Sequence, residues 1–379
     1  MDKKRIGISD ITVGQALPWD VTDANGRLLL HKGYVVERMQ QIEALVERGM
    51  YVGSGGLIAT KPDCVAERPK KVPSTLHLIN LTKKRLEHLL LNVINEPDLE
   101  TKCLEVVKTV NDACMISADV AHASILLSRD GGSYPVSHSV DAAIVSILIA
   151  RALKKSSDEI VAIAAAALTM NVSMIKLQEK LQHQQTELTE LERKLINNHS
   201  QEGVNMLKNA GVDNKDWLSF VLLHHENEDG SGYPNGIRGD AIPQSAKIIS
   251  LADRYCARIS SRSYRKALLP NSALRDMLVT DKEHISPMLI KCFIEVLGVY
   301  PAGTFVRLEN GETAVVTSKG ESTTTPFVHS YIGSRGDVLI EPLKRDTSKA
   351  HYSIREVISA EHANFRLSMQ RIWGDTACL

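Results

Sequence analysis

The sequence has few aromatic residues, few cysteines and no excess of either charge. Aromatic side chains make up 4% of the 379 residues, so the cores are expected to be aliphatic. The six cysteines are scattered without a CxxC pair, which is typical of a reduced, cytoplasmic chain. Lys+Arg and Asp+Glu both number 45, so no overall attraction to nucleic acid or to an anionic membrane is expected.

The sequence also lacks a visible targeting segment and a long apolar run. The basic start, Met1–Ile6, is not followed by the apolar region of a signal peptide. The most apolar segment, Ile160–Leu168, is far shorter than the roughly 20 residues that a membrane span requires. We therefore predict a soluble, cytoplasmic protein with neither nucleic acid nor a membrane among its partners.

The hydrophobic pattern changes twice along the chain and predicts a mostly α protein with small β-containing modules at both ends. A chain of this length exceeds one typical domain. Short runs around Asn25-Gly26 and after Tyr300 are typical of β-hairpins, and a helical stripe covers residues 35–46. The predicted organisation is an αβ module at 1–53, a linker at 54–74, a helical domain at 75–299 with its core at 120–299, a β subdomain at 300–345 and a tail at 346–379.

The middle of the chain is predicted to be helical throughout. Apolar residues recur three and four positions apart, and breaks are expected at Gly131-Gly132, Lys154–Ser157 and Asn209–Asn214. The polar stretch Gln178–Glu192 is interpreted as a solvated helix or loop rather than a partner surface. The predicted helices cover 74–94, 98–115, 117–129, 137–153, 157–170, 186–210, 214–224, 244–259, 271–279 and 286–298.

Two adjacent histidines, His224 and His225, stand between an apolar helical run and a loop rich in Gly. The run Trp217–Leu223 predicts a buried helix, and Ile248–Ala257 predicts another that carries Asp253 on its inner side. Such an arrangement can gather imidazole and carboxylate groups around a metal ion. A single histidine on an apolar helix is more often structural, but two adjacent histidines before this loop favour a metal site.

Two earlier histidines lie on other predicted helices. His138 opens a helix with an evident apolar face, and His199 lies near the middle of the helix predicted over 186–210. Both stay candidates for either a structural or a ligating role. The complete set of candidate metal ligands is His138, His199, His224, His225 and Asp253.

The segment His224–Tyr255 resembles the signature of the HD-GYP family. The matching residues are His224-His225-Glu226, Asp229–Pro234, Gly236, Gly239-Asp240, Ile242-Pro243, Ala246–Ile249 and Ala252-Asp253. His138 and the His199–Gly203 element fall in family order, and the resemblance covers roughly residues 120–340. It implies an all-helical domain that hydrolyses cyclic di-GMP. His and Asp residues of such a domain hold two or three metal ions.

The chain departs from the family at its His-Asp pair. The family reads A-A-L-L-H-D-I-G-K where residues 166–174 read AALTMNVSM, so Met170, Asn171 and Met174 replace His, Asp and Lys. The thioether of Met170 is a poor ligand for Fe, Mn or Mg. The neutral amide of Asn171 bridges two cations poorly, and Met174 offers no ammonium group to a phosphate.

The resemblance implies two metal positions that the replacements affect unequally. One position keeps only His138 and Asp253, whereas the other keeps its three histidines. Three imidazoles can hold one divalent ion, such as Fe or Mn, with an open water position. One bound ion and an empty site are the two alternatives, and a complete dinuclear centre is not expected. Hydrolysis is accordingly expected to be absent or very weak, since the two-ion clamp is lost.

Two further features concern ligand and partner binding. The resemblance places Arg262 and Arg265 on the family's two basic positions, which contact guanylate phosphates, and Lys266 adds a charge. A solvated helix end is the alternative interpretation of this segment. Gly232, Tyr233 and Pro234 form the GYP loop, which in the family serves recognition and partner contact more than chemistry.

The sequence therefore predicts a catalytically degenerate HD-GYP-family protein in cyclic di-GMP signalling, acting as a nucleotide sensor or a protein-interaction scaffold. Its expected partners are cyclic di-GMP and a signalling protein such as a GGDEF-type diguanylate cyclase, and self-association is left open. One alternative is a weak phosphodiesterase that runs on a single ion. The other is a purely structural docking module for a diguanylate cyclase or another regulator.

Overall fold

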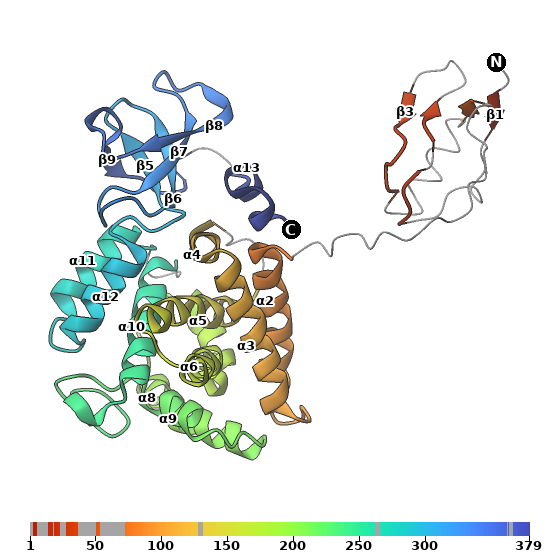
Figure 1. Ribbon diagram of the computed structural model, residues 1–379. Helices are drawn as coiled ribbons and strands as arrows, with labels where there is room; N and C mark the ends of the chain where they lie inside the picture. The colour runs from red at the N-terminus through yellow and green to blue at the C-terminus, as the bar shows by residue number, and fades with distance from the viewer. Residues whose placement is uncertain are drawn as a thin grey trace. The chain divides into compact units, whose positions relative to one another are not determined.

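The computed structural model describes residues 3–5, 14–17, 19–22, 28–36, 51–53, 73–127, 132–261, 266–361, 363 and 367–379. The chain divides into two compact units, Met1–Lys71 and Val72–Leu379 (Figure 1). Each unit has its own sheet, and the helices described here all belong to the second unit.

The first unit contains a small sheet of short strands in the order β1-β4-β2-β3. Its strands are β1 (Lys3–Arg5), β2 (Val21–Thr22), β3 (Leu28–Leu30) and β4 (Tyr51–Gly53). Strands β2 and β3 pair antiparallel on either side of Asn25-Gly26, as a hairpin requires. The turn itself and nearly all of the helix predicted over 35–46 lie outside the described residues; Val35 pairs with Ala16 in an isolated β-bridge.

The second unit is predominantly helical, which confirms the predicted fold class. Its helices before the sheet are α2 (Thr75–Asn92), α3 (Leu99–Ile116), α4 (Ala118–Leu127), α5 (Tyr134–Ala152), α6 (Ser157–Thr169), α7 (Ile175–His183), α8 (Glu190–Asn209), α9 (Lys215–Leu223), α10 (Gln244–Ile259), α11 (Pro270–Thr280) and α12 (Pro287–Leu297).

Capping side chains decide where two of these helices begin. Ser156 and Glu159 form a capping box at the start of α6, and Thr189 and Glu192 form another at the start of α8. The second box explains why α8 begins at Glu190 and not at residue 186. The polar stretch before it contains the end of α7 and a loop, so both of its predicted forms occur.

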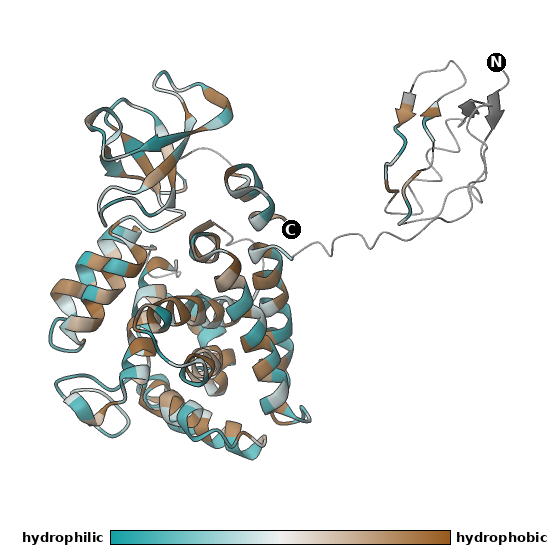
Figure 2. Ribbon diagram, in the orientation of Figure 1, coloured by the Kyte–Doolittle hydropathy of each residue, from teal (hydrophilic) through white to brown (hydrophobic). Residues whose placement is uncertain are grey.

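Helices α5 and α6 form the centre of the helical core. Figure 2 shows strongly hydrophobic colour on both, whereas α11 and α12 alternate between hydrophobic and hydrophilic residues. Two segments, Tyr134–Ala152 and Ser157–His183, are long and apolar enough to cross a membrane, but 83% and 67% of their most apolar windows are buried inside the fold. Their apolar character is therefore accounted for by packing in the core.

The C-terminal sheet is antiparallel with the order β8-β7-β6-β5-β9. Its strands are β5 (Phe305–Leu308), β6 (Thr313–Ser318), β7 (Phe327–Ile332), β8 (Val338–Asp346) and β9 (Ile354–Val357). The sheet extends beyond the predicted β subdomain, because β9 lies within the segment predicted as a tail and pairs with β5. The residues of β9 read Ile-Arg-Glu-Val and do not alternate between apolar and polar, so they give no strand signal by themselves. Helix α13 (Met369–Trp373) follows.

A close backbone approach joins helix α4 to the segment that leads into the sheet. Gly303 has φ +92°, and a Cβ placed on it would lie 2.9 Å from Ala123 Cα and 3.1 Å from the Ala123 carbonyl oxygen. Just before it, the Ala302 carbonyl oxygen accepts a hydrogen bond from His122 Nδ1 at 3.1 Å. Only glycine fits this contact without moving the helix away from the sheet.

We expect Gly303→Ala to destabilise the protein more than the control substitution Gly336→Ala. Both glycines have positive φ, so alanine is strained at both by about 1–2 kcal/mol, but only Gly303 has backbone atoms within 4 Å of the added methyl group. Overpacking there adds a further ~1–3 kcal/mol. Urea unfolding of the two variants measures the difference, and equal losses would mean that α4 moves aside at no cost.

His122 makes the stability of this joint depend on pH. Its side chain is buried, and burial lowers the pKa of His122 from 6.5 to about 4, although the bond to Ala302 opposes that shift. An unfolded chain therefore binds more protons between these two values, so stability is fully present above pH 6.5 and is lost as the pH falls toward 4.

The substitution His122→Asn should flatten that dependence, because an amide can still donate to Ala302 but does not titrate. The difference in unfolding free energy between pH 7 and pH 4 should shrink by an amount on the order of 3 kcal/mol. Denaturant titrations at several pH values test this, and parallel pH profiles for the two proteins would contradict it.

Candidate metal centre

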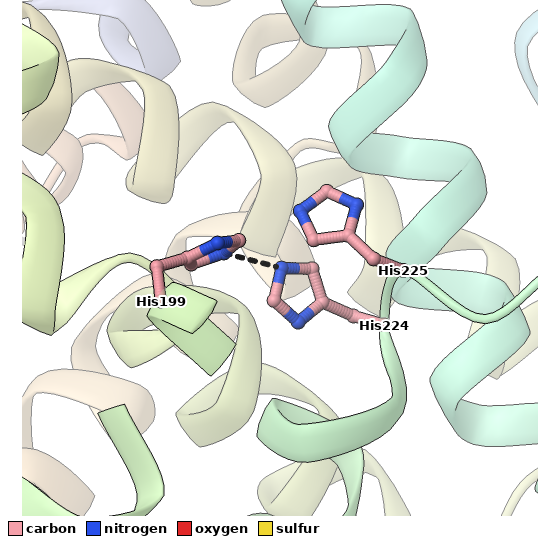
Figure 3. Close-up of side chains that lie close together, drawn as sticks. All are labelled: His199, His224 and His225. Carbon is pink, nitrogen blue, oxygen red and sulfur yellow. Dashed lines mark hydrogen bonds between the residues drawn. The ribbon is translucent and has the colours of Figure 1, made fainter. Parts of the chain in front are cut away.

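Three histidines converge where α8 meets the end of α9. His199 comes from α8, His224 caps the C-terminus of α9, and His225 opens the following loop (Figure 3). One ring nitrogen from each lies within 4.8 Å of the others. The structure thus brings together the three imidazoles that were predicted to share one metal position. His199 precedes His224 by 25 residues in the sequence.

Backbone hydrogen bonds fix the tautomers of two of these rings. His199 Nδ1 donates to the Ile196 carbonyl oxygen at 2.5 Å, and His224 Nδ1 donates to the Val221 carbonyl oxygen at 2.7 Å. The two Nε2 atoms then face each other at 3.3 Å, the contact drawn in Figure 3. With both protons on Nδ1, two lone pairs meet there, which a cation between them would relieve.

That spacing suits two ligands of one ion. Two nitrogen ligands of a tetrahedral ion with metal–nitrogen bonds of about 2.0–2.1 Å lie about 3.3–3.4 Å apart. The backbone carbonyls also hold each ring by its other nitrogen, as is usual for histidines that bind metals. The residues present therefore fit a single divalent ion, and the cluster could hold one.

Electrostatics keep the cluster in its ligating form. Burial, and after it the neighbouring His199, lowers the pKa of His224 to about 4. Burial and the charges of both neighbours also lower the pKa of His225, and burial lowers that of His199. All three rings are consequently neutral at pH 7, and the neutral imidazole is the form that binds metal.

The remaining two candidate ligands contact each other. His138 Nε2, on α5, lies 2.6 Å from Asp253 Oδ1, on α10. Burial alone would raise the pKa of Asp253, but the hydrogen bond and charge of His138 outweigh it and hold that pKa below its usual range. Asp253 is thus a carboxylate bonded to an imidazole, and His138 Nδ1 has no hydrogen-bond partner among the described residues.

The replaced positions lie beside these groups. Met170 is the C-cap residue of α6 and is packed in the core, with no exposed surface. Asn171 follows it and is buried, and its Oδ1 finds no hydrogen-bond partner within the described part of the chain. Asn171 and Met174 both line the cavity that also contains His138 and Asp253.

That cavity has a volume of about 200 Å³. Its lining also includes six residues that were not predicted as site residues, namely Tyr134, Gln178, Leu181, Gln182, Ile196 and Ala257. Tyr134 lies one turn before His138 and stacks on its ring at 5.7 Å, and Gln178 lies one turn after Met174. Helical spacing from the candidate residues would have found both. The described residues that line the cavity include neither lysine nor arginine.

The GYP loop packs directly on the adjacent histidines. Tyr233 stacks on His225 with ring centroids 4.7 Å apart, and the Tyr233–Pro234 peptide is cis. A Cβ on Gly232 would lie 2.4 Å from the His225 carbonyl oxygen, so only glycine allows the loop to approach this closely. Arg262 and Arg265 lie outside the described residues, and Lys266 is exposed and does not line the cavity.

Comparison with known proteins gives matches over the helical part of the chain. A family profile described as an HD domain matches residues 122–289. A cyclic di-GMP phosphodiesterase of Pseudomonas aeruginosa is 30% identical over 270 residues, which cover 69% of this chain and 65% of that protein. A cyclic di-GMP phosphodiesterase of Borreliella burgdorferi is 23% identical over 208 residues, 55% of this chain and 54% of that protein. The matched stretch spans less than two thirds of either relative.

A solved structure described as an HDGYP protein from Bdellovibrio bacteriovorus has a TM-score of 0.47 and 15% identity, over 78% of this chain and 99% of that one. The family profile and the curated relatives define an HD domain in this chain. More narrowly, the profile and the relatives support a domain of the HD-GYP family in this chain, as the residues from His224 to Asp253 predicted.

Proposed function

We propose that this protein is a member of its family that does not hydrolyse cyclic di-GMP and acts in cyclic di-GMP signalling as a nucleotide sensor or an interaction scaffold. The observation that carries the proposal is Asn171, a neutral amide where the resemblance implies the carboxylate that bridges two ions. In addition, His138 Nε2 and Asp253 Oδ1 form a hydrogen bond of 2.6 Å. Without the bridging anion, two cations repel each other and the clamp on the attacking and leaving oxygens is lost.

A single divalent ion such as Fe or Mn would be held by His199, His224 and His225. Bound there, it would polarise a phosphate oxygen or lower the pKa of a bound water. The rest of the site would orient a ligand: Tyr233 closes over His225, and Asp253 presents a carboxylate to the cavity.

Nucleotide binding should then depend on that ion. The described residues lining the cavity supply the carboxylate of Asp253 and no cationic side chain, so a phosphodiester would meet like charge unless a metal ion faced it. Calorimetry with cyclic di-GMP should show binding to the Mn-loaded protein and at least about tenfold weaker binding after chelation, since charge-assisted contacts contribute more than 1.4 kcal/mol. No heat at about 100 µM ligand in either state would leave only the scaffold role.

A weak single-ion phosphodiesterase is the second candidate, and the 3.3 Å approach of His199 to His224 favours it. Turnover of cyclic di-GMP with added Mn or Fe should be compared in the intact chain and in the His224→Ala/His225→Ala variant. Equal traces in both proteins would assign the activity to a contaminant. Turnover that disappears in the variant would establish the enzyme and displace the proposal above.

In the proposed scaffold role, a GGDEF-type diguanylate cyclase or another regulator docks on the GYP loop. The substitution Tyr233→Ala tests it without disturbing Gly232, whose backbone packs against the histidine pair. Capture of a purified diguanylate cyclase by the intact chain but not by this variant would support docking through the loop. Equal capture by both proteins would place the contact elsewhere.

A further inference from the structure

A second and larger cavity lies at the joint between the helices and the C-terminal sheet. Its volume is about 500 Å³, and it is lined by the ends of α3, α5 and α12, the start of α4, and the end of β6 with the turn that follows. Arg151, one of its lining residues, stands thirteen residues after His138 on α5, which places it roughly 20 Å away along the helix. The cavity is therefore distinct from the candidate metal centre.

Two buried polar atoms of this lining have no hydrogen-bond partner among the described residues. One is Nε2 of His122, whose side chain is 2% exposed. Because Nδ1 of that ring donates to the Ala302 carbonyl oxygen, the neutral ring leaves Nε2 as an acceptor. The other is Nε–H of Arg151, a donor. A buried donor or acceptor without a partner is destabilising, so a ligand that supplied the partners would be favoured.

The Arg151 side chain is held in place for such a role. Its Nη2 donates to Asn111 Oδ1 at 2.8 Å, and Nη1 contacts the sulfur of Met115. The guanidinium is therefore anchored on its outer side while Nε remains unused. A fixed guanidinium with a free donor recognises a carboxylate or phosphate oxygen well.

The cavity also carries charge of the opposite sign. The carboxylates of Asp119, Glu295 and Glu321 line it together with Arg151 and Lys319. Burial raises the pKa of the Asp119 carboxyl, while the charge of Lys319 opposes the shift. A purely anionic ligand would be repelled by Asp119, and a purely cationic one by Arg151 and Lys319. Leu148 and Val316 supply apolar wall between these charges.

We propose that this cavity binds a small zwitterion, an amino acid or a related molecule that carries an ammonium group and a carboxylate on an apolar body. The carboxylate meets Arg151, and the ammonium group donates to His122 Nε2 and faces Asp119. The volume is in the range of sites for small organic ligands. None of the residues of the candidate metal centre lines this cavity, so ligand binding here can be tested independently of the proposed function.

Ligand-observed NMR titration of the full chain tests the chemistry. The probes are L-leucine, L-methionine and L-phenylalanine, compared with 2-phenylethylamine and 3-phenylpropionate, which each keep one of the two charged groups of phenylalanine. At least one amino acid should saturate the protein, and the single-charge analogues should bind about tenfold more weakly than phenylalanine or worse. If none of the amino acids saturates the protein below about 10 mM, the proposal is overturned.

Variants then locate the site. Arg151→Met should weaken amino-acid binding at least about tenfold, because it removes the partner of the carboxylate. Ala152→Leu, at an exposed position on the rim, should weaken binding by narrowing the entrance without disturbing the core. Lys155→Met is the matched control, since Lys155 pairs with Glu159 outside the cavity. Binding that survives both cavity variants unchanged would place the ligand elsewhere and refute the assignment.

Discussion

Restoring the three replaced positions, with Met170→His, Asn171→Asp and Met174→Lys together, is expected to raise hydrolysis of cyclic di-GMP roughly a thousandfold, since a second metal ion contributes several kcal/mol of transition-state stabilisation. Asn171 is the decisive position. Its side chain is buried beside His138 and Asp253, and its Oδ1 has no hydrogen-bond partner among the described residues. A carboxylate there would face an imidazole and a carboxylate already poised to share an ion.

Two measurements check this restoration, because activity alone would not show its cause. Metal analysis should rise toward two equivalents in the triple variant, and turnover should rise with it. The matched control adds Asp253→Asn to the triple variant, which removes a ligand of the restored ion while keeping the three new side chains. It should lose most of the gained activity. Thermal unfolding of both variants should also be measured, because Met170 is fully buried and an imidazole at that position lowers the stability of the core.

An inactive triple variant that holds two ions would mean that the cavity is no longer shaped for the substrate. The opposite finding would be more damaging. If the unmodified chain already held two ions and cut cyclic di-GMP rapidly, Asn171 would be an adequate bridge and the proposed loss of hydrolysis would be wrong.

The helical core could be predicted because its signals are local. The apolar periodicity of α5 and α6 and the run before His224 are each readable within a few turns of sequence. Strand β9 and the exact start of α8 were not predicted, because local periodicity does not determine them. Strand β9 forms by pairing with β5 across nearly fifty residues, and α8 begins at a capping box that interrupts a continuing helical pattern.

The grouping of the histidines was also foreseeable, but their bonding was not. Family order placed His199 with the adjacent pair. The bond between His138 and Asp253 joins residues 115 positions apart and depends on how α5 packs against α10, which no local pattern encodes. The same holds for the cavity at the sheet, where His122, Arg151 and Lys319 come from three separate elements. Contacts of this kind need the three-dimensional arrangement.

The variant His224→Ala/His225→Ala is expected to abolish metal binding. The unmodified chain, purified without chelator, should carry close to one equivalent of a divalent ion, and the variant less than about a tenth, since one imidazole alone holds such ions weakly. The geometry gives the reason: the 3.3 Å contact between His199 and His224 is set by two backbone hydrogen bonds, so the site is organised before the ion arrives. Elemental analysis by mass spectrometry provides the measurement.

His138→Ala is the matched control for this experiment, because it removes a buried imidazole of the same cavity that lies outside the three-histidine cluster. If the ion sits on the cluster alone, this variant keeps its equivalent of metal even though Asp253 loses its partner. If metal content falls in parallel in both variants, the ion is shared between the two halves of the site. The five candidate ligands would then act as one centre despite Asn171. If the unmodified chain carries less than about a tenth of an equivalent of metal, the three-histidine metal site is excluded.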